Sequence, residues 1–334
     1  MRRISLLIVL FLLCLPLGMS AETLRGDVNG NGRVDIGDVT RLIDYLLSGN
    51  SASMNLDNAD VKKDGIISIA DVTCLIDYLL SGTWPSNTQT FTVNGVSFTM
   101  VDVEGGIFLM GATYEQGLND PWEDEYPVHM VTLSNYSIGQ TEVTQELWDA
   151  VMSVNLPELC GNSYYTSANG YDDNPQRPAE TVDYNLAQRF IRQLNLLTGQ
   201  QFHLPTEAQW EFAARGGNLS CRYKFSGSDN PDEVAWYMNT VPEECPQPVG
   251  TKKPNELGLY DMSGNVSEMC YDAYADYSYE PQTDPSIPYN SDHNYHVIRG
   301  GHFKYPSQYI RVSSRVRLVS FFPIVHTTGI RLAL

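Results

Sequence analysis

The sequence predicts a two-part protein in which a small all-α unit precedes a larger, loop-rich α+β domain. Its 334 residues exceed one typical domain and suffice for a module plus a domain with its own core. A twelve-residue segment occurs twice near the N-terminus, and beyond residue 90 short β-like runs alternate with helical stretches and many glycines. Hydrophobic residues make up 42%, which is typical of folded soluble proteins and argues against general disorder.

Residues 1–20 predict a cleavable signal peptide. Two arginines open the chain, an apolar run follows from residue 4 to about residue 17, and Gly18 and Ser20 are the small residues before the expected cleavage site. The run is too short to span a bilayer comfortably, and no other segment predicts a membrane span. We therefore expect an exported protein that is periplasmic, attached to the cell surface or secreted. A lipid anchor on Cys14 is the alternative, although no small residues precede this cysteine.

The chain is strongly acidic, with a net charge of −19 at pH 7. An acidic surface repels polyphosphates and anionic membranes, and it attracts divalent cations. Nucleic acid is therefore excluded as an expected partner.

Five cysteines remain once the signal peptide is removed, and they are Cys74, Cys160, Cys221, Cys245 and Cys270. An odd number leaves at least one of them unpaired in an oxidising compartment. A bridge between Cys221 and Cys245 is conceivable, but mostly buried free thiols are the favoured interpretation.

Residues 38–49 and 71–82 are two copies of one unit, identical at eleven of twelve positions with an offset of 33 residues. Apolar residues recur in each copy at helical spacing, namely Val39, Leu42, Ile43 and Leu46 in the first and Val72, Leu75, Ile76 and Leu79 in the second. We expect two short helices that pack on each other through these residues.

A loop with the spacing of calcium ligands precedes the first copy. Short oxygen-bearing side chains at alternate positions let a chain wrap a hard cation, and a glycine supplies the sharp turn, here Gly32. The predicted ligands are the side chains of Asp27, Asn29, Asn31, Asp35 and Asp38 and the backbone carbonyl of Arg33.

The second loop keeps only part of this pattern. Its predicted ligands are Asp60, Asp64, Asp71 and the carbonyl of Ile66, while Lys62 and Ser68 replace two ligands of the first loop. An ammonium group that points into a cation site costs Coulomb energy. We expect a weaker second site, or one that fills only with Lys62 turned outward.

Two such loops, each ending in Asp and followed by one helix, resemble a dockerin module over residues 26–83. The resemblance implies a cohesin-type partner on a scaffold or cell surface. It places the partner contacts at the tenth and eleventh loop positions, which are Ile36 and Gly37 in the first loop and Ile69 and Ala70 in the second. The alternative is a calcium-folded appendage with no docking role.

Residues 84–95 are predicted to be a linker, because Pro85 and polar residues open the segment without periodicity. The domain that follows, residues 96–334, shows β-like runs over 98–103 and 128–133 and helical patterns over 144–152 and 184–197. A third helix is expected to begin after Thr206, with Trp210 and Phe212 facing inward. Periodicity alone supports an irregular α+β domain.

Ordered motifs say more about this domain. They include Gly-Gly-Ile-Phe-Leu-Met-Gly at 105–111, Glu-Val-Thr at 142–144, Pro-Thr-Glu-Ala-Gln-Trp-Glu-Phe at 205–212, Gly-Asn-Val-Ser-Glu at 264–268 and Arg-Gly-Gly at 299–301. In order and spacing the domain resembles the sulfatase-modifying-factor family, whose best-known members generate formylglycine. The resemblance implies a loop-rich fold like that of a C-type lectin, with a small mixed sheet.

The residues that formylglycine generation requires are not found at the corresponding positions of this sequence. The family's oxidase holds copper through two cysteines after the Arg-Gly-Gly motif, and these positions fall on Tyr305 and Ile310. Neither side chain can replace a thiolate, the ligand that Cu(I) requires. The resemblance therefore implies that copper is not a cofactor and that the domain binds rather than oxidises.

Other activities find little support in the sequence. A Gly-x-Ser-x-Gly turn of a serine hydrolase does not occur. His293, His296 and His302 could in principle hold a metal ion, but a solvated histidine cluster is the favoured interpretation. An oxidoreductase of the same family, another enzyme at the same cleft and a structural component of a surface assembly stay as alternatives.

The resemblance also carries over a structural calcium site and a ligand face. The calcium ligands would be the side chains of Asp261 and Glu268 and the carbonyls of Gly264 and Val266. A second family calcium site is expected to be lost, because Trp236 replaces its asparagine.

The ligand face would consist of His302, Phe303, Tyr305, Gln308 and Tyr309, whose rings and amide suit a glycan or a protein. The sequence thus predicts an exported, calcium-binding protein with a catalytically degenerate binding or accessory domain.

Overall fold

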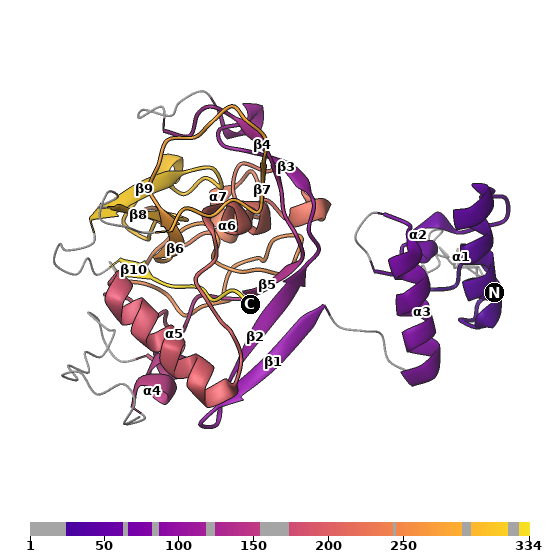
Figure 1. Ribbon diagram of the computed structural model, residues 1–334, viewed down its shortest axis with the longest axis horizontal. Helices are drawn as coiled ribbons and strands as arrows, with labels where there is room; N and C mark the ends of the chain where they lie inside the picture. Colours follow the sequence, from indigo (N-terminus) through magenta and orange to yellow (C-terminus); the bar gives the residue numbers. More distant parts are fainter. Residues whose placement is uncertain are drawn as a thin grey trace, which may run out of the picture. The chain divides into compact units, whose positions relative to one another are not determined.

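A computed structural model describes residues 25–62, 66–81, 87–117, 124–153, 174–242, 245–288, 295–319 and 327–334. The predicted signal peptide, Asp64, Cys160 and His293 lie outside these residues. The chain divides into two compact units, Met1–Pro85 and Ser86–Leu334 (Figure 1). Within the described residues, no helix has the length and hydropathy needed to cross a membrane.

The described part of the smaller unit holds three helices, α1 (Ile36–Ser48), α2 (Leu56–Ala59) and α3 (Ile69–Ser81). Helices α1 and α3 are the two copies of the repeat. Asp35 begins α1 as its N-cap, with its Oδ1 atom accepting from the Gly37 N–H at 2.7 Å. Gly49 ends the helix in the left-handed conformation, with φ of 71°, which glycine adopts without steric cost.

A small apolar core joins the repeated helices, as predicted. Val39 and Leu42 of α1 pack in one cluster with Val72 and Leu75 of α3. The prediction was wrong for Ile43 and its counterpart Ile76, which are 37% and 38% exposed. The reason is helical geometry, because the next residue after a buried one lies about 100° further round the helix.

The larger unit is a mixed α/β domain with little regular structure for its length (Figure 1). Its helices are α4 (Gln145–Met152), α5 (Tyr184–Thr198), α6 (Glu207–Ala214) and α7 (Pro231–Val234). Its strands are β1 (Thr88–Val93), β2 (Val96–Val103), β3 (Ile107–Met110), β4 (His129–Thr132), β5 (Tyr136–Gly139), β6 (Ser267–Ala273), β7 (Gln282–Thr283), β8 (Tyr295–Arg299), β9 (Arg315–Val319) and β10 (Thr328–Gly329).

The strands form three small sheets, where the sequence led us to expect one. Their orders are β1-β2-β5, β10-β6-β8-β9 and β3-β4-β7. The second is mixed, because β10 pairs in parallel with β6 while β6, β8 and β9 are antiparallel. This sheet brings the C-terminal strands beside the Gly-Asn-Val-Ser-Glu segment.

The three predicted helices are confirmed as α4, α5 and α6. Thr144 and Thr206 are the N-caps of α4 and α6, and each side chain accepts from the backbone N–H three residues on at 3.2 Å. Trp210 and Phe212 are buried, as predicted.

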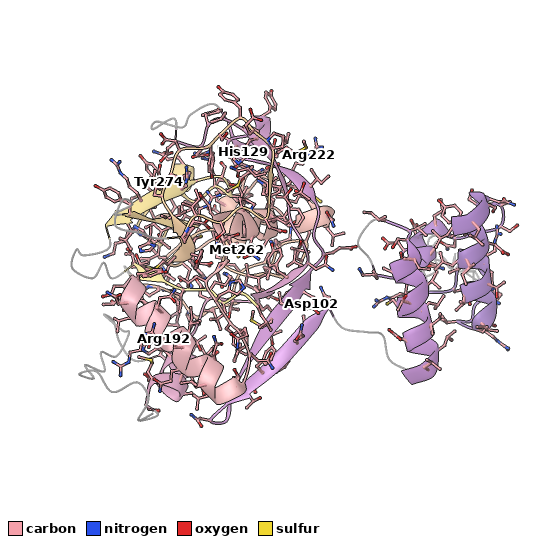
Figure 2. All side chains as sticks on the ribbon, in the orientation of Figure 1. Asp102, His129, Arg192, Arg222, Met262 and Tyr274 are labelled. Atoms are coloured by element: carbon pink, nitrogen blue, oxygen red, sulfur yellow. The ribbon has the colours of Figure 1, made fainter. Side chains whose placement is uncertain are left out.

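Two large apolar clusters fill much of the larger unit, and a smaller one surrounds Ile310. One packs α4 and α5 against β1 and β2, and the other packs α6 between the sheets. Met262 of the second cluster is 1% exposed and is labelled near the middle of the unit in Figure 2. Its neighbour Asp261 therefore lies deep in the fold, where a charged group needs a partner.

Candidate functional site

The first calcium loop, residues 27–38, is closed by its own carboxylates. The Oδ1 and Oδ2 atoms of Asp27 accept from the N–H groups of Asn31 and Gly32 at 2.9 and 2.8 Å. The two oxygens of Asp38 accept from the N–H groups of Asn29 and Asp35 at 3.0 and 2.8 Å. The ends of the loop are thus held around a common centre.

The residues of this loop fit a hard cation. Asp27 and Asp38 are 5% and 0% exposed, and neither forms a salt bridge to a basic side chain of the described chain. Gly30 and Gly32 have φ of 71° and 81°, so the backbone turns in a way that favours glycine at both positions. Buried carboxylates without a cationic side chain, in a loop rich in oxygen atoms, match the donor set of calcium.

The second loop has the same closure at its end. The Oδ1 and Oδ2 atoms of Asp71 accept from the N–H groups of Lys62 and Ser68, both at 2.8 Å. Lys62 is an exposed residue. Ile66 is 53% exposed, while the predicted ligand Asp64 lies outside the described residues.

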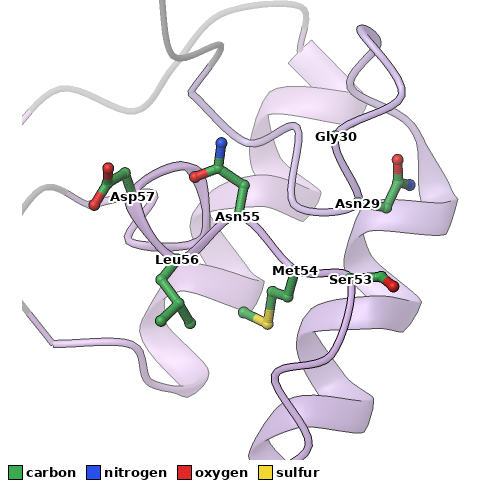
Figure 3. A pocket seen from close by; sticks show the side chains of 7 residues that line it. All are labelled: Asn29, Gly30, Ser53, Met54, Asn55, Leu56 and Asp57. Carbon is green, nitrogen blue, oxygen red and sulfur yellow. The ribbon is translucent and has the colours of Figure 1, made fainter.

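A shallow pocket of about 560 Å³ lies beside the first loop. Asn29 and Gly30 form one side and residues 53–57 form the other, as Figure 3 shows. Ser53 has φ of 59°, and the Asn55 N–H donates to the Val28 carbonyl at 2.8 Å. The segment between the repeats is therefore bound to the first loop through its backbone.

A second acidic site lies inside the larger unit and consists of Glu142, Asp261 and Glu268, here called the carboxylate cluster. All three are at most 2% exposed. Glu268 forms a bidentate ion pair with Arg331, whose Nε and Nη2 atoms lie 2.8 and 2.6 Å from its two oxygens. The Trp210 indole N–H also donates to Glu268 at 2.6 Å.

The other two carboxylates have no such cation. Asp261 accepts from the Gly250 N–H at 2.7 Å through Oδ2, while its Oδ1 is buried without a hydrogen-bond partner among the described residues. Glu142 accepts from the Val266 N–H at 3.3 Å and from the Asn265 side-chain amide at 3.2 Å. One guanidinium thus stands among three carboxylates, which leaves two negative charges uncompensated when all are ionised.

Burial sets the protonation of this cluster. It raises the pKa of Asp261 to about 6, with the Glu268 charge adding to the effect. Burial also raises the pKa of Glu142 well above its usual value, helped by the charges of Asp261 and Glu268. Both acids therefore take up a proton at a higher pH than free carboxyl groups do, and a cation that enters the cluster would oppose this uptake.

The carboxylates of two predicted ligands, Asp261 and Glu268, lie close enough to interact, and the charge of the cluster is compatible with a divalent cation. The orphaned Oδ1 of Asp261 and the two uncompensated charges are what a divalent cation would satisfy. Glu268 is already engaged by Arg331 and Trp210, a restriction that the sequence did not reveal. Glu142 was missed, because nothing in its local sequence connects it with residues 261–268.

Neither acidic site holds a cation through charged side chains alone. In the described parts of the chain, no three or more His, Cys, Asp or Glu side chains form a group that could bind a metal ion. Amide and backbone oxygens would therefore have to complete both ligand sets. For the cluster these would be the carbonyls of Gly264 and Val266. Position 264 requires glycine, because a Cβ atom there would lie 2.3 Å from the Trp236 carbonyl oxygen.

The predicted ligand face is only partly accessible. Phe303 is 0% exposed and belongs to the interior, so its predicted contact with a ligand is wrong. His302 is 9% exposed, and its ring contacts that of Tyr305 at a tilt of 35°, with centroids 3.7 Å apart. The ring centroids of Tyr305 and Tyr309 are 5.4 Å apart. Burial, with the nearby Lys304 charge, lowers the pKa of His302 to about 4. Tyr305, Gln308 and Tyr309 remain for contact with solvent.

Tyr305 and Ile310 occupy the two positions at which the family's oxidases have copper-binding cysteines. Ile310 is 0% exposed and packs with Phe225, Val234, Ala235 and Tyr237, and Tyr305 packs against this cluster. Cys270, the cysteine closest in sequence, is buried in the core around α6. Burial raises its pKa well above the usual value, which keeps it a thiol.

Among the described residues, no cluster of cysteines and histidines that could hold a metal ion forms at the ligand face. The described cysteines, Cys74, Cys221, Cys245 and Cys270, form no disulfide bonds, and Cys221 is exposed while Cys245 is buried. The structure therefore has no bridge between these two, and three of the four described cysteines are buried. His296 is 0% exposed and stacks on Tyr184, with ring centroids 3.9 Å apart, so it does not belong to a solvated cluster.

Comparison with known proteins covers both units. The family model described as sulfatase-modifying factor enzyme 1-like domain matches residues 87–334, and the dockerin type I domain model matches residues 25–80. The chaperone protein LppX of Paenibacillus barcinonensis is 32% identical over 243 residues, 62% of this chain and 79% of LppX. The formylglycine-generating enzyme of Streptomyces coelicolor is 27% identical over 271 residues, 64% of this chain and 82% of the enzyme.

Solved structures resemble the larger unit. Treponema denticola variable protein 1 is 30% identical with a TM-score of 0.59, and PvdO from Pseudomonas aeruginosa is 25% identical with a TM-score of 0.62. Each comparison covers 75% of this chain and 99% of the other.

Proposed function

The chain belongs to the family of sulfatase-modifying factor enzyme 1-like domains and carries a dockerin type I domain ahead of it, and on this premise we propose an exported, calcium-stabilised binding or accessory protein. The dockerin domain attaches the protein to a cohesin-type partner. The family domain binds a glycan or a protein without oxidising it. The observation that carries this proposal is the complete burial of Ile310.

Burial of Ile310 argues against copper chemistry at this position. A copper centre needs two thiolates that approach one ion and a path for substrate to reach it. Here an isobutyl group packs against Phe225 and Tyr237, and the ring of Tyr305 lies over the same cluster. Apolar packing of this kind supports a binding role over copper-dependent oxidation at this position.

The exposed part of the face supports binding. Tyr305 and Tyr309 offer neighbouring rings, and Gln308 offers a directional amide. These side chains pack against buried neighbours, so binding a ligand should cost little of their conformational entropy. The relative LppX is named a chaperone protein, which is a binding role and is consistent with an accessory function.

Calcium is the cofactor that the dockerin domain supports. We assign Asp27, Asn29, Asn31, Arg33, Asp35 and Asp38 to a first ion. A second, weaker site in the module would use Asp60, Asp64, Ile66 and Asp71. In the larger domain, Asp261 with the carbonyls of Gly264 and Val266 would hold a structural ion beside Glu268 and Glu142.

Docking is supported by exposed apolar side chains that recur in both repeats. Ile36, Ile43 and Leu47 are 70%, 37% and 82% exposed, and Ile69, Ile76 and Leu80 are 70%, 38% and 82% exposed. Each set lies on one side of its helix, away from the small core. An apolar stripe of this kind marks an interaction surface.

A ligand screen tests the binding role. The mature protein is applied to a glycan array and to a panel of exported proteins, with Tyr309→Ala as the probe variant and Tyr279→Ala, an 84% exposed tyrosine elsewhere, as the control. We expect a ligand that the control retains and Tyr309→Ala loses. Conversion of a Cys-x-Pro-x-Arg peptide to formylglycine in the presence of copper would overturn the proposal.

A pull-down with cohesin domains tests attachment. In calcium we expect capture of the wild type and of Leu196→Asp, a control on α5, but not of Leu47→Asp with Leu80→Asp. Chelation should release the wild type. Failure of the wild type in calcium would remove docking from the proposal and leave calcium binding intact.

A further inference from the structure

Two residues at equivalent positions of the repeat reach across from one copy to the other. Arg25 and Asn58 are 33 residues apart, and each stands two residues before the first aspartate of its loop. The Nε atom of Arg25 donates to the Val61 carbonyl of the second loop at 2.5 Å. The side-chain amide of Asn58 donates to the Asp27 carbonyl of the first loop at 2.9 Å. The contacts are reciprocal, so each loop is held by the residue that introduces the other.

Backbone hydrogen bonds reinforce this connection. The Gly26 N–H donates to the Asn58 carbonyl at 3.0 Å, and the Asn55 N–H donates to the Val28 carbonyl at 2.8 Å. Val28 and Val61, the second residues of the two loops, are both 0% exposed in the shared core. The starts of the loops are therefore buried together and cannot move independently.

The environment of Asn58 indicates a specific role for its amide. Asn58 is 3% exposed, and its Oδ1 atom has no hydrogen-bond partner among the described residues. A buried unpaired acceptor is unfavourable, so an apolar residue of the same size would fit this position better for stability alone. The NH2 group of the Asn58 amide explains why an asparagine occupies this position, because its hydrogen bond connects the two loops.

We propose that Arg25 and Asn58 couple the two calcium loops, so that an ion in the first loop raises the calcium affinity of the second. The first loop has a full ligand set and fills first. An ion in the first loop orders Asp27, whose carbonyl accepts the hydrogen bond from the Asn58 side chain. Asn58 lies in the last turn of α2, and Asp60, the first residue of the second loop, follows directly after this helix. The second loop, weakened by Lys62, is thus preorganised by the first. Coupling of this kind is reciprocal by linkage.

This inference rests on the calcium binding proposed above, and a site-resolved titration separates the two. Amide resonances of Gly32 and Ser68 in the mature protein report the loops, since these N–H groups donate to Asp27 and Asp71. Calcium is titrated into wild type, Asn58→Leu, Arg25→Met and the surface control Asn50→Leu. Far-UV circular dichroism at saturating calcium checks that each variant is folded.

In the wild type and the control, we expect the Gly32 resonance to shift first and Ser68 to follow. Asn58→Leu should leave the calcium affinity of the first loop within about threefold and lower that of the second at least about fivefold, the lower range of measured couplings. Arg25→Met should act in the same direction. An unchanged second affinity in both variants, or a second loop that never fills in the wild type, would overturn the coupling. A first loop that does not respond to calcium would instead overturn the proposed function.

Discussion

The first calcium loop and the carboxylate cluster of the larger domain hold negative charge in different ways. The loop gathers its carboxylates within twelve residues and balances them with backbone N–H groups, which glycines bring into reach. The cluster gathers carboxylates from distant segments and balances one of them with a buried guanidinium. We therefore expect the loop to need a bound ion for its order, and the fold around the cluster to persist without one.

The largest effect expected from this difference concerns Glu268. Glu268→Leu leaves the Arg331 guanidinium buried without its carboxylate, which typically costs about 3–5 kcal/mol of the free energy of unfolding. Urea unfolding of the larger domain measures the loss. Glu280→Leu, an exposed site, should change the same quantity by less than about 0.5 kcal/mol. A comparable result for both variants would mean that Arg331 finds another partner.

Calcium removal should lower the stability of the small unit more than that of the larger domain. At a calcium concentration about 100 times the dissociation constant, binding adds about 2.7 kcal/mol to the stability of the small unit. Chelation, or Asp38→Asn, should remove that amount and lower the helical circular dichroism from α1 and α3. Asp44→Asn on the exposed side of α1 is the control. Helicity that is independent of calcium would show that the small core suffices by itself.

This contrast also separates what the sequence predicts from what only the fold reveals. The sequence can propose ligands of the loop because their spacing is local, and it predicted α4, α5 and α6 because caps and periodicity are local too. Glu142 was not, since its place beside Asp261 depends on the path of the whole domain. For the same reason Phe303 was assigned to the ligand face although the fold buries it.

Proton binding to Asp261 should produce a smaller effect with a defined sign. Its folded pKa of about 6 exceeds the value of 3.8 for a free side chain, so the folded state binds more protons between these pH values. The stabilisation is complete below about pH 4 and is lost as the pH rises toward 6 in the calcium-free protein, by roughly 2 kcal/mol. Calcium should suppress this loss by neutralising the cluster.

Asp261→Asn isolates this contribution from other buried acids. Asparagine still accepts from the Gly250 N–H but does not titrate. In chelator, the difference in free energy of unfolding between variant and wild type should therefore change between pH 4 and pH 6, and in calcium it should not. A difference that is flat in chelator would mean that Asp261 does not hold a proton in the fold.

The smallest expected effect separates the two loops of the repeat. Lys62→Asn restores the oxygen found at the equivalent position of the first loop, Asn29, and removes an ammonium group. Because the Lys62 side chain is already exposed, little repulsion is relieved, and we expect the calcium affinity of the second loop to rise about tenfold, or 1.4 kcal/mol. Titration followed at the Ser68 amide measures it, with Lys253→Asn in the larger domain as the control. A rise of several hundredfold would show that Lys62 occupies the site in the calcium-free protein, and the weakness of the second loop would then come from competition rather than from a missing ligand.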